Sequence, residues 1–140
     1  MTPTLVPELI VTDLDASLTF YRDLLGFAID YERPQERFIY LSGHGATIML
    51  EQPFSRDRLW PKAELVYPFG RGINLEVNVK NVDMLHANVR TADVDVFLPL
   101  EEKWYRRKSD DVCVRQFAVH DPDGYLIRLS QEIGSRPVTR

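Results

Sequence analysis

The side chains that most often carry out chemistry are few in this sequence, and they are far apart along it. Its three histidines are His44, His86 and His120, and its single cysteine is Cys113. The histidines fall in a predicted turn, on a predicted helix and at the end of a predicted strand. No serine or cysteine can be grouped with them into a nucleophile–base arrangement. Cys113 is therefore interpreted as a small core or pocket-lining residue rather than as a nucleophile.

Acidic and amide side chains on a strand are a better starting point for function. Residues 73–79 alternate strictly, with apolar side chains on one face and Asn74, Glu76 and Asn78 on the other. A carboxylate in such a row could serve as a general base or could hold a cationic ligand. Both chemistries stay open at this point.

The elements that must position these residues form a pattern that occurs twice. Asp13 is a suitable N-cap for a helix whose apolar face repeats at Leu14, Leu18, Tyr21 and Leu25, and Gly26 suits its end. Val82, Leu85 and Val89 mark a second helix. Each helix is expected to follow one strand and to precede three, at residues 5–11, 28–32, 38–42 and 46–51, and then at 73–79, 94–100, 112–120 and 125–131.

This repeat, at an offset of about 68 residues, predicts two modules. They are residues 1–52 and 73–133, joined by a loop at 53–72 and followed by a loose tail at 134–140. The loop carries Trp60 among several aromatic residues, which favours either a lid or a plug over the core. Residues 101–111, with Trp104, read as a charged hairpin tip or a second lid.

Composition limits the classes of function. The chain has 140 residues, 44% of them hydrophobic and 27% charged, which is typical of an ordinary globular core. Its net charge of -4 argues against a nucleic-acid partner, because phosphate-binding surfaces are usually basic. No apolar run is long enough to span a membrane, and the first residues do not resemble a signal peptide. Together with the single cysteine, this favours the cytoplasm.

Two motifs carry a family resemblance. Residues 11–27 read VTDLDASLTFYRDLLGF, and residues 117–125 read FAVHDPDGY. In this order and at this separation, they resemble the opening and closing motifs of the glyoxalase/bleomycin-resistance/extradiol dioxygenase superfamily, also called the vicinal oxygen chelate superfamily. The resemblance implies an α+β fold of two βαβββ modules. Their curved mixed sheets would surround a cup, and the modules would pair across a homodimer.

The same resemblance allows the family's metal positions to be checked. They fall on Val6, Met49, Asn74 and Arg128, and only Asn74 offers even a weak oxygen ligand. Arg128 would place a permanent cation where a metal would sit. The expectation is therefore no metal, no other cofactor and no catalytic residue.

The cup that the resemblance implies contains charged and aromatic residues instead. The bleomycin-resistance branch, which binds a bulky cationic drug without metal ligands, is the nearest match, although Cys113 stands where that branch often has a tryptophan. Trp60 or Trp104 could supply the missing ring. The predicted ligand-binding residues are Glu8, Phe38, Met49, Glu51, Trp60, Asn74, Glu76, Trp104, Cys113, Phe117 and Arg128.

The predicted function is binding of a bleomycin-like or other cationic or planar antibiotic by a cytoplasmic dimer. Three alternatives remain open. Arg128 could simply pair with Glu8 or Glu76 and neutralise the cup. The chain could be a glyoxalase-like lyase or dioxygenase-type enzyme, either with unusual metal ligands or metal-free with Glu8 or Glu76 as the base. It could also be a purely structural or partner-binding dimer.

Overall fold

The computed structural model describes residues 2–57, 59–61 and 63–138 of the chain. The first half contains β1 (Glu8–Ile10), α1 (Leu14–Leu18), the π-helix η1 (Thr19–Leu24), β2 (Ala28–Arg33), the 3-10 turn η2 (Pro34–Glu36), β3 (Phe38–Gly43) and β4 (Ala46–Glu51). The second half contains β5 (Asn74–Asn78), α2 (Val82–Thr91), β6 (Val96–Arg106), β7 (Asp110–His120) and β8 (Leu126–Pro137).

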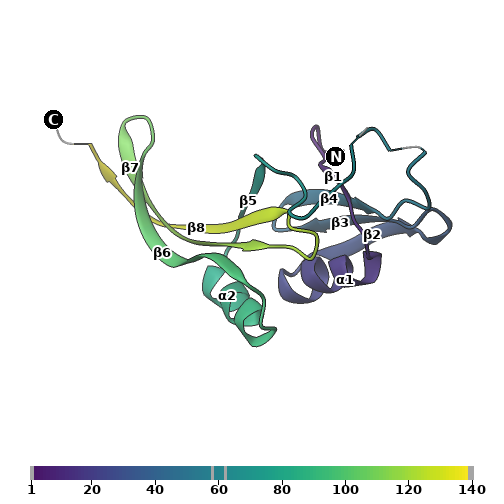
Figure 1. Ribbon diagram of the computed structural model, residues 1–140. Helices are drawn as coiled ribbons and strands as arrows, with labels where there is room; N and C mark the ends of the chain where they lie inside the picture. The colour runs from purple at the N-terminus through teal and green to yellow at the C-terminus, as the bar shows by residue number, and fades with distance from the viewer. Residues whose placement is uncertain (1, 58, 62, 139–140) are drawn as a thin grey trace.

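These strands form two sheets with the same plan. The strand order is β1-β4-β3-β2 in the first sheet and β5-β8-β7-β6 in the second. In each sheet the first strand runs parallel to the last, and the remaining pairs are antiparallel. Figure 1 shows α1 and α2 on the same side of the two sheets. The α+β fold of two βαβββ modules with curved mixed sheets is confirmed.

The first helix begins as the sequence predicts and ends differently. The Asp13 carboxylate accepts hydrogen bonds from the backbone N–H groups of Asp15 and Ala16, as an N-cap does. From Thr19 the helix widens into a π-helix, and Leu25 N–H donates to the Phe20 carbonyl at 3.1 Å. Phe20 and its neighbour Tyr21 are both buried in this segment, whereas the predicted apolar face included Tyr21 and not Phe20.

The core lies between the helices and the sheets, and it is shared by both modules. Leu9, Leu50, Val77 and Ile127 belong to one cluster with residues of both helices. A buried hydrogen bond also connects the two modules. The Tyr21 hydroxyl donates to Asp121 at 2.6 Å, although the two residues are 100 positions apart in the sequence. Desolvation raises the pKa of Asp121, and the hydrogen bond from Tyr21 partly offsets this.

The second sheet is longer than the sequence indicated. β6 and β7 continue through most of residues 101–111, so the prediction of a charged hairpin tip is confirmed, with its turn at residues 107–109, but both of its strands extend further than expected. Residues 134–137 extend β8, so the prediction of a loose tail is wrong for them, while residues 139–140 lie outside the described part. Cross-strand pairing explains both corrections, because β8 pairs with β7 as far as Pro137.

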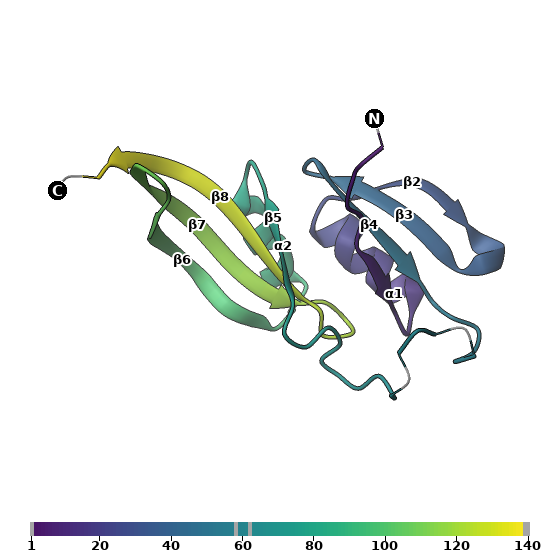
Figure 2. The same ribbon diagram turned by 90° about the horizontal axis from the view of Figure 1, so that it is seen from above.

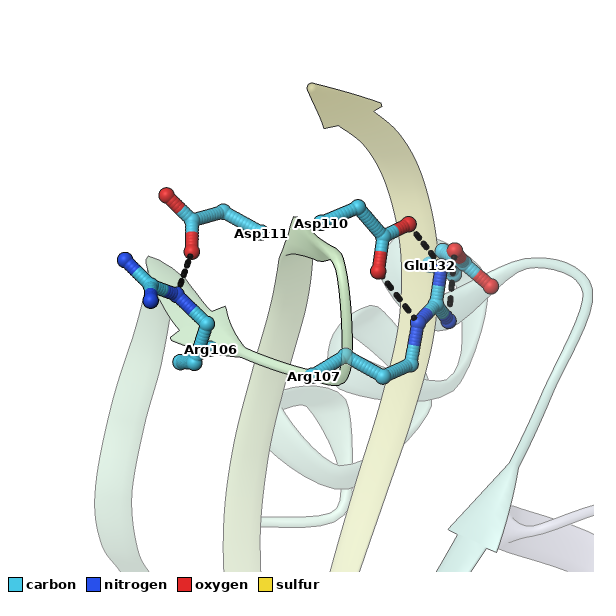
Figure 3. A network of polar contacts seen from close by, with 5 residues as sticks. All are labelled: Arg106, Arg107, Asp110, Asp111 and Glu132. Atoms are coloured by element: carbon cyan, nitrogen blue, oxygen red, sulfur yellow. Dashed lines mark hydrogen bonds and ion pairs between the residues drawn. The ribbon is translucent and has the colours of Figure 1, made fainter. Parts of the chain in front are cut away.

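Figures 1 and 2 show this end of the second sheet extending away from α2. Its tip is held by ion pairs between neighbouring strands. Arg107 pairs with Asp110 at 2.7 Å and with Glu132 at 3.2 Å, and Arg106 pairs with Asp111 at 2.8 Å (Figure 3). Because Arg106, Arg107, Asp110 and Asp111 take part in these ion pairs, their formal charges do not indicate a charged partner.

Two apolar residues do not lie where strand alternation suggested. Leu5 and Ile73 begin the predicted strands 5–11 and 73–79, whose apolar faces should be buried, but they are 84% and 65% exposed. Both precede the first residue of their strand, so the alternation does not apply to them. No helix in the described part of the chain is long and apolar enough to cross a membrane.

The segment between the modules contains neither helix nor strand in its described residues. Phe69 is buried, and its ring stands edge-on to the Tyr125 ring with centroids 5.8 Å apart. Trp60 is 82% exposed. The interpretation of this loop as a plug over the core therefore holds for Phe69 and does not hold for Trp60.

Candidate ligand-binding faces

Each sheet has one face packed on the helices and one free of them, which we call its open face. On the first sheet the buried residues Leu9, Leu41 and Leu50 mark the helix side. Because side chains alternate and the strands are in register, the opposite side carries a row that includes Glu8, Ile10, Tyr40, Met49 and Glu51. Three predicted ligand-binding residues, Glu8, Met49 and Glu51, thus share the first open face.

Aromatic rings line the outer part of this face. Phe38 lies opposite Glu51, and Tyr40 opposite Met49. The rings of Tyr31 and Tyr40 are stacked, with centroids 4.6 Å apart and an interplanar angle of 17°. Tyr31 and Tyr40 are functional candidates that sequence reasoning missed.

Phe38 is only 3% exposed although it lies on the open face. The reason is Arg33, whose Cζ sits 3.9 Å from the centre of the Phe38 ring. Arg33 Nε donates to Glu36 at 2.6 Å, which holds the guanidinium over the ring. The first open face therefore already has one planar cation stacked on an aromatic ring.

The two carboxylates of this face affect each other. Partial burial raises the pKa of Glu8, the negative charge of Glu51 raises it further, and Arg33 acts in the opposite direction. The net direction is upward, mainly because of the partial burial, and the charge of Glu51 adds a repulsion to it. A cation bound beside Glu8 would relieve that repulsion.

An open depression of about 850 Å³ lies at one end of the first open face. Tyr31, Tyr40, Ser42 and Thr47 line it, together with Asp30, which accepts a hydrogen bond from the Ser42 hydroxyl at 2.8 Å. Glu8 and Glu51 are not part of the lining. The depression is thus next to the aromatic stack, and the carboxylates lie beyond it along the same face.

The second open face carries polar residues that pair with one another. Glu76 lies opposite Arg128, and the ion pair between Glu76 Oε2 and Arg128 Nη2 measures 3.6 Å. Asn74, from the same strand, lies two residues away on the same face. The interpretation in which Arg128 pairs with Glu76 is therefore confirmed, and Glu8 is not the partner.

Gln116 is a buried member of the second open face that sequence reasoning missed. It lies opposite Ser130 and is 2% exposed. Its Nε2 donates to the Tyr105 hydroxyl at 2.8 Å and to Glu101 Oε2 at 3.3 Å. A glutamine within a run of strand residues gives no sequence signal for such a network, because only the register of β6 on β7 brings its partners close.

One end of the second open face is aromatic. His120 lies opposite Leu126, and its ring is 5.5 Å from that of Phe97 and 6.1 Å from that of Tyr67. Phe97 and Tyr67 are 64% and 56% exposed. This cluster offers a second set of rings, contributed by the inter-module segment, β6 and β7.

Three predicted site residues lie on the helix side of the second sheet. Phe117 is fully buried, and its ring lies edge-on to that of His86 in α2, so the structure places it in the core and not on an open face. Cys113 has the same strand parity as Phe117 and is buried, and Trp104 lies opposite Cys113. Arg136 covers the Trp104 ring, with Cζ 4.0 Å from its centre. Neither Trp104 nor the exposed Trp60 joins an open face.

The residues present do not fit the metal centre that the family resemblance implied. Among the described residues, no three His, Cys, Asp or Glu side chains are close enough to hold an ion together. At the position expected for the carboxylate ligand of β8, the Arg128 guanidinium is paired with Glu76. No reaction step through a metal is therefore derived.

Comparison with known proteins establishes the family. The chain belongs to the Glyoxalase/Bleomycin resistance protein/Dioxygenase superfamily, whose sequence model matches residues 4–129. A superfamily member from Vibrio splendidus 12B01 is 38% identical, over 91% of this chain and 97% of that one, with a TM-score of 0.42. No curated protein matches the chain.

Two further solved structures are similar in fold. Virulence protein STM3117 from Salmonella typhimurium is 21% identical with a TM-score of 0.66, over 95% of this chain and 98% of that one. TioX from Micromonospora sp. ML1 is 23% identical with a TM-score of 0.65, over 94% and 100%. At these levels of sequence identity, the two structures indicate a shared fold and not a shared function.

Proposed function

We propose that this protein binds a planar, cationic small molecule, such as a bleomycin-like antibiotic, without a metal and without changing it. The observation that carries the proposal is the first open face, on which the stacked Tyr31 and Tyr40 share one side of the sheet with Glu8 and Glu51. Aromatic rings attract flat cations, and a carboxylate with a raised pKa, such as Glu8, gains from a nearby positive charge. Arg33 on Phe38 illustrates that this face accommodates such a group.

We propose that the complete site is formed by two copies of the chain in the cytoplasm. Both open faces are directed away from the helices, so a second copy could bring its second open face over the first (Figure 1). Exposed Phe97 and Tyr67 would then supply rings opposite Tyr31 and Tyr40. The buried free thiol of Cys113 is compatible with a reducing compartment.

A second candidate function is supported by Glu8 alone. Its raised pKa would make it a suitable general base for a metal-free reaction of the glyoxalase-like kind. In that case Glu8→Gln would abolish turnover of a carbonyl substrate while leaving its binding largely intact. Loss of binding in the same variant would favour the binding protein.

Calorimetric titration tests the main proposal, with metal-free bleomycin and 9-aminoacridine as probes. We expect saturable binding that weakens with salt and by about ten-fold in Glu8→Gln and in Glu51→Gln. Glu32→Gln is the matched control, because it removes the same charge from β2 at a position that pairs with the core residue Ile39. Absence of binding for both probes up to about 1 mM would reject the proposal.

A further inference from the structure

A bulge in β2 directs two consecutive residues into the depression of the first open face. β2 pairs Ile29 with Leu41 and Tyr31 with Tyr40, so Asp30 is the extra residue between two paired positions. Because a bulge interrupts the alternation of side chains, Asp30 and Tyr31 both line the depression of about 850 Å³. Among the described residues that line it, Asp30 alone carries a charged side chain.

Asp30 is held in place by Ser42, and the two side chains form a pair that can only accept hydrogen bonds. The Ser42 hydroxyl donates its one proton to Asp30 Oδ1 at 2.8 Å. Within the described part of the chain, the second carboxylate oxygen of Asp30 has no hydrogen-bond partner, and the Ser42 oxygen keeps a lone pair. Both residues line the open depression and are reachable from solvent. A group that binds this pair directly must therefore bring hydrogen-bond donors.

The rings beside this pair favour a positive charge on that group. Tyr31 is 47% exposed, so its ring can be reached although it stacks on Tyr40. A cation is attracted both by an aromatic ring and by a carboxylate, whereas an anion would be repelled by Asp30. Thr47, which lies opposite Ser42 on β4, adds another hydroxyl to the wall of the depression.

We propose that Asp30 and Ser42 anchor a cationic group that carries N–H donors, such as a primary ammonium, an amidinium or a guanidinium. Its N–H groups would donate to Asp30 Oδ2 and Ser42 Oγ, and the rest of the ligand would lie against the tyrosine stack. A quaternary ammonium ion fits less well, because it is attracted by the same charge and rings but has no donor for the pair. This inference rests on the proposed function, and it specifies the kind of cation that the first open face selects.

The test compares two cations that differ only in their N–H groups. Phenethylamine, which is protonated at neutral pH, and its N,N,N-trimethyl derivative have the same ring, chain and charge. Aromatic rings alone bind a trimethylammonium group well, so a preference for the primary ammonium reports the acceptor pair. We expect the protein to bind the primary ammonium probe about five-fold more tightly in an NMR titration.

Two variants separate the contributions of the pair. Ser42→Ala removes one acceptor and keeps the charge, so the ratio should fall to about two-fold while the trimethyl probe binds as before. Unchanged binding of the trimethyl probe also checks that this variant is folded. Asp30→Ala should weaken both probes and remove the preference. Glu32→Ala is the matched control, because it removes the same charge from an exposed position of β2 outside the depression, and it should keep the five-fold ratio.

Three results would overturn the anchor. They are equal or tighter binding of the trimethyl probe to the unmodified protein, a five-fold ratio that survives in Asp30→Ala, and failure of the ammonium probe to bind at roughly 10 mM.

Titration of 9-aminoacridine on the same samples separates this inference from the proposed function. If 9-aminoacridine binds and the preference for N–H groups is absent, the anchor is wrong and the proposed cation binding stands. If the ammonium probe is selected and 9-aminoacridine does not bind, the anchor stands and the proposal of a planar ligand is wrong.

Discussion

The two open faces carry carboxylates at corresponding places, Glu8 in β1 and Glu76 in β5, but surround them differently. Across the parallel pair of each sheet, Glu8 meets Met49, whereas Glu76 meets Arg128. Glu76 is therefore paired with a cation, while Glu8 has Glu51 for a neighbour and a raised pKa. The residue opposite the carboxylate thus differs between the two sheets, and under our proposal this difference favours a cation on the first open face.

The other residues of the two open faces also differ. The first open face adds stacked rings, which suit flat molecules, whereas on the second Gln116 and Arg128 are held by neighbouring carboxylates. A duplicated module can in this way provide stacking and charge on one copy, while polar groups of the other copy are paired with one another.

The largest expected effect concerns the buried hydrogen bond between Tyr21 and Asp121, which connects the two modules. Tyr21→Phe removes the donor to buried Asp121 and should lower the free energy of unfolding by about 2 kcal/mol at pH 7. Since the hydroxyl stabilises the ionised carboxylate, its loss raises the pKa of Asp121 further. The destabilisation should therefore shrink as the pH falls towards 3.8, the ordinary value for aspartate, where Asp121 is protonated with or without Tyr21.

Urea unfolding at pH 7 and pH 4 measures this effect. Tyr125→Phe is the matched control, because its hydroxyl donates to the neutral carbonyl of Ile10 at 2.9 Å and should give a smaller loss. A loss in Tyr21→Phe that is the same at both pH values would show that the Asp121 charge is not involved.

The next prediction converts the first face into the second. Met49→Arg places a cation opposite Glu8, as Arg128 lies opposite Glu76, and should weaken binding of 9-aminoacridine by at least about ten-fold. Met49→Leu should bind nearly as well as the unmodified protein. Calorimetry distinguishes them, and unchanged affinity in Met49→Arg would remove the basis of the comparison.

A smaller effect is expected at Arg33. Because its charge lowers the pKa of Glu8 and its side chain covers Phe38, Arg33→Gln should bind 9-aminoacridine about three-fold more tightly at pH 7. Binding needs ionised Glu8, so affinity falls as the pH drops through the pKa of Glu8, and this midpoint should move upward in the variant. A midpoint that moves downward would contradict the assignment.

The smallest effect is expected at the tip of the second sheet. Arg107→Gln breaks exposed ion pairs with Asp110 and Glu132, which solvent screens, so it should leave the thermal unfolding midpoint and the binding of both probes almost unchanged (Figure 3). A marked loss of probe binding, measured in parallel, would place the tip in the site.

The family resemblance predicted the fold and placed Glu8, Met49, Glu51, Asn74, Glu76 and Arg128 together in the cup. Strand alternation, which is a local property, supported the facing of Asn74 and Glu76 by itself. Alternation did not predict that Tyr31 shares a face with Tyr40. The register of β2 shifts between Ile29 and Tyr31, and this shift brings the Tyr31 ring onto Tyr40. Phe117 was misplaced for a related reason, because its face depends on how β7 pairs with β6 and β8 and not on its motif. The hydrogen bonds of Gln116 likewise need a strand that the sequence analysis ended at residue 100.

The most direct test of a cation-binding first open face is an NMR titration with 9-aminoacridine that follows the ring protons of Tyr31, Tyr40 and Phe38. We predict upfield ring-current shifts at these three residues, saturating together with the calorimetric isotherm and absent from core Phe117. Shifts confined to Trp60 or Trp104, with Tyr31 and Tyr40 unchanged, would contradict it.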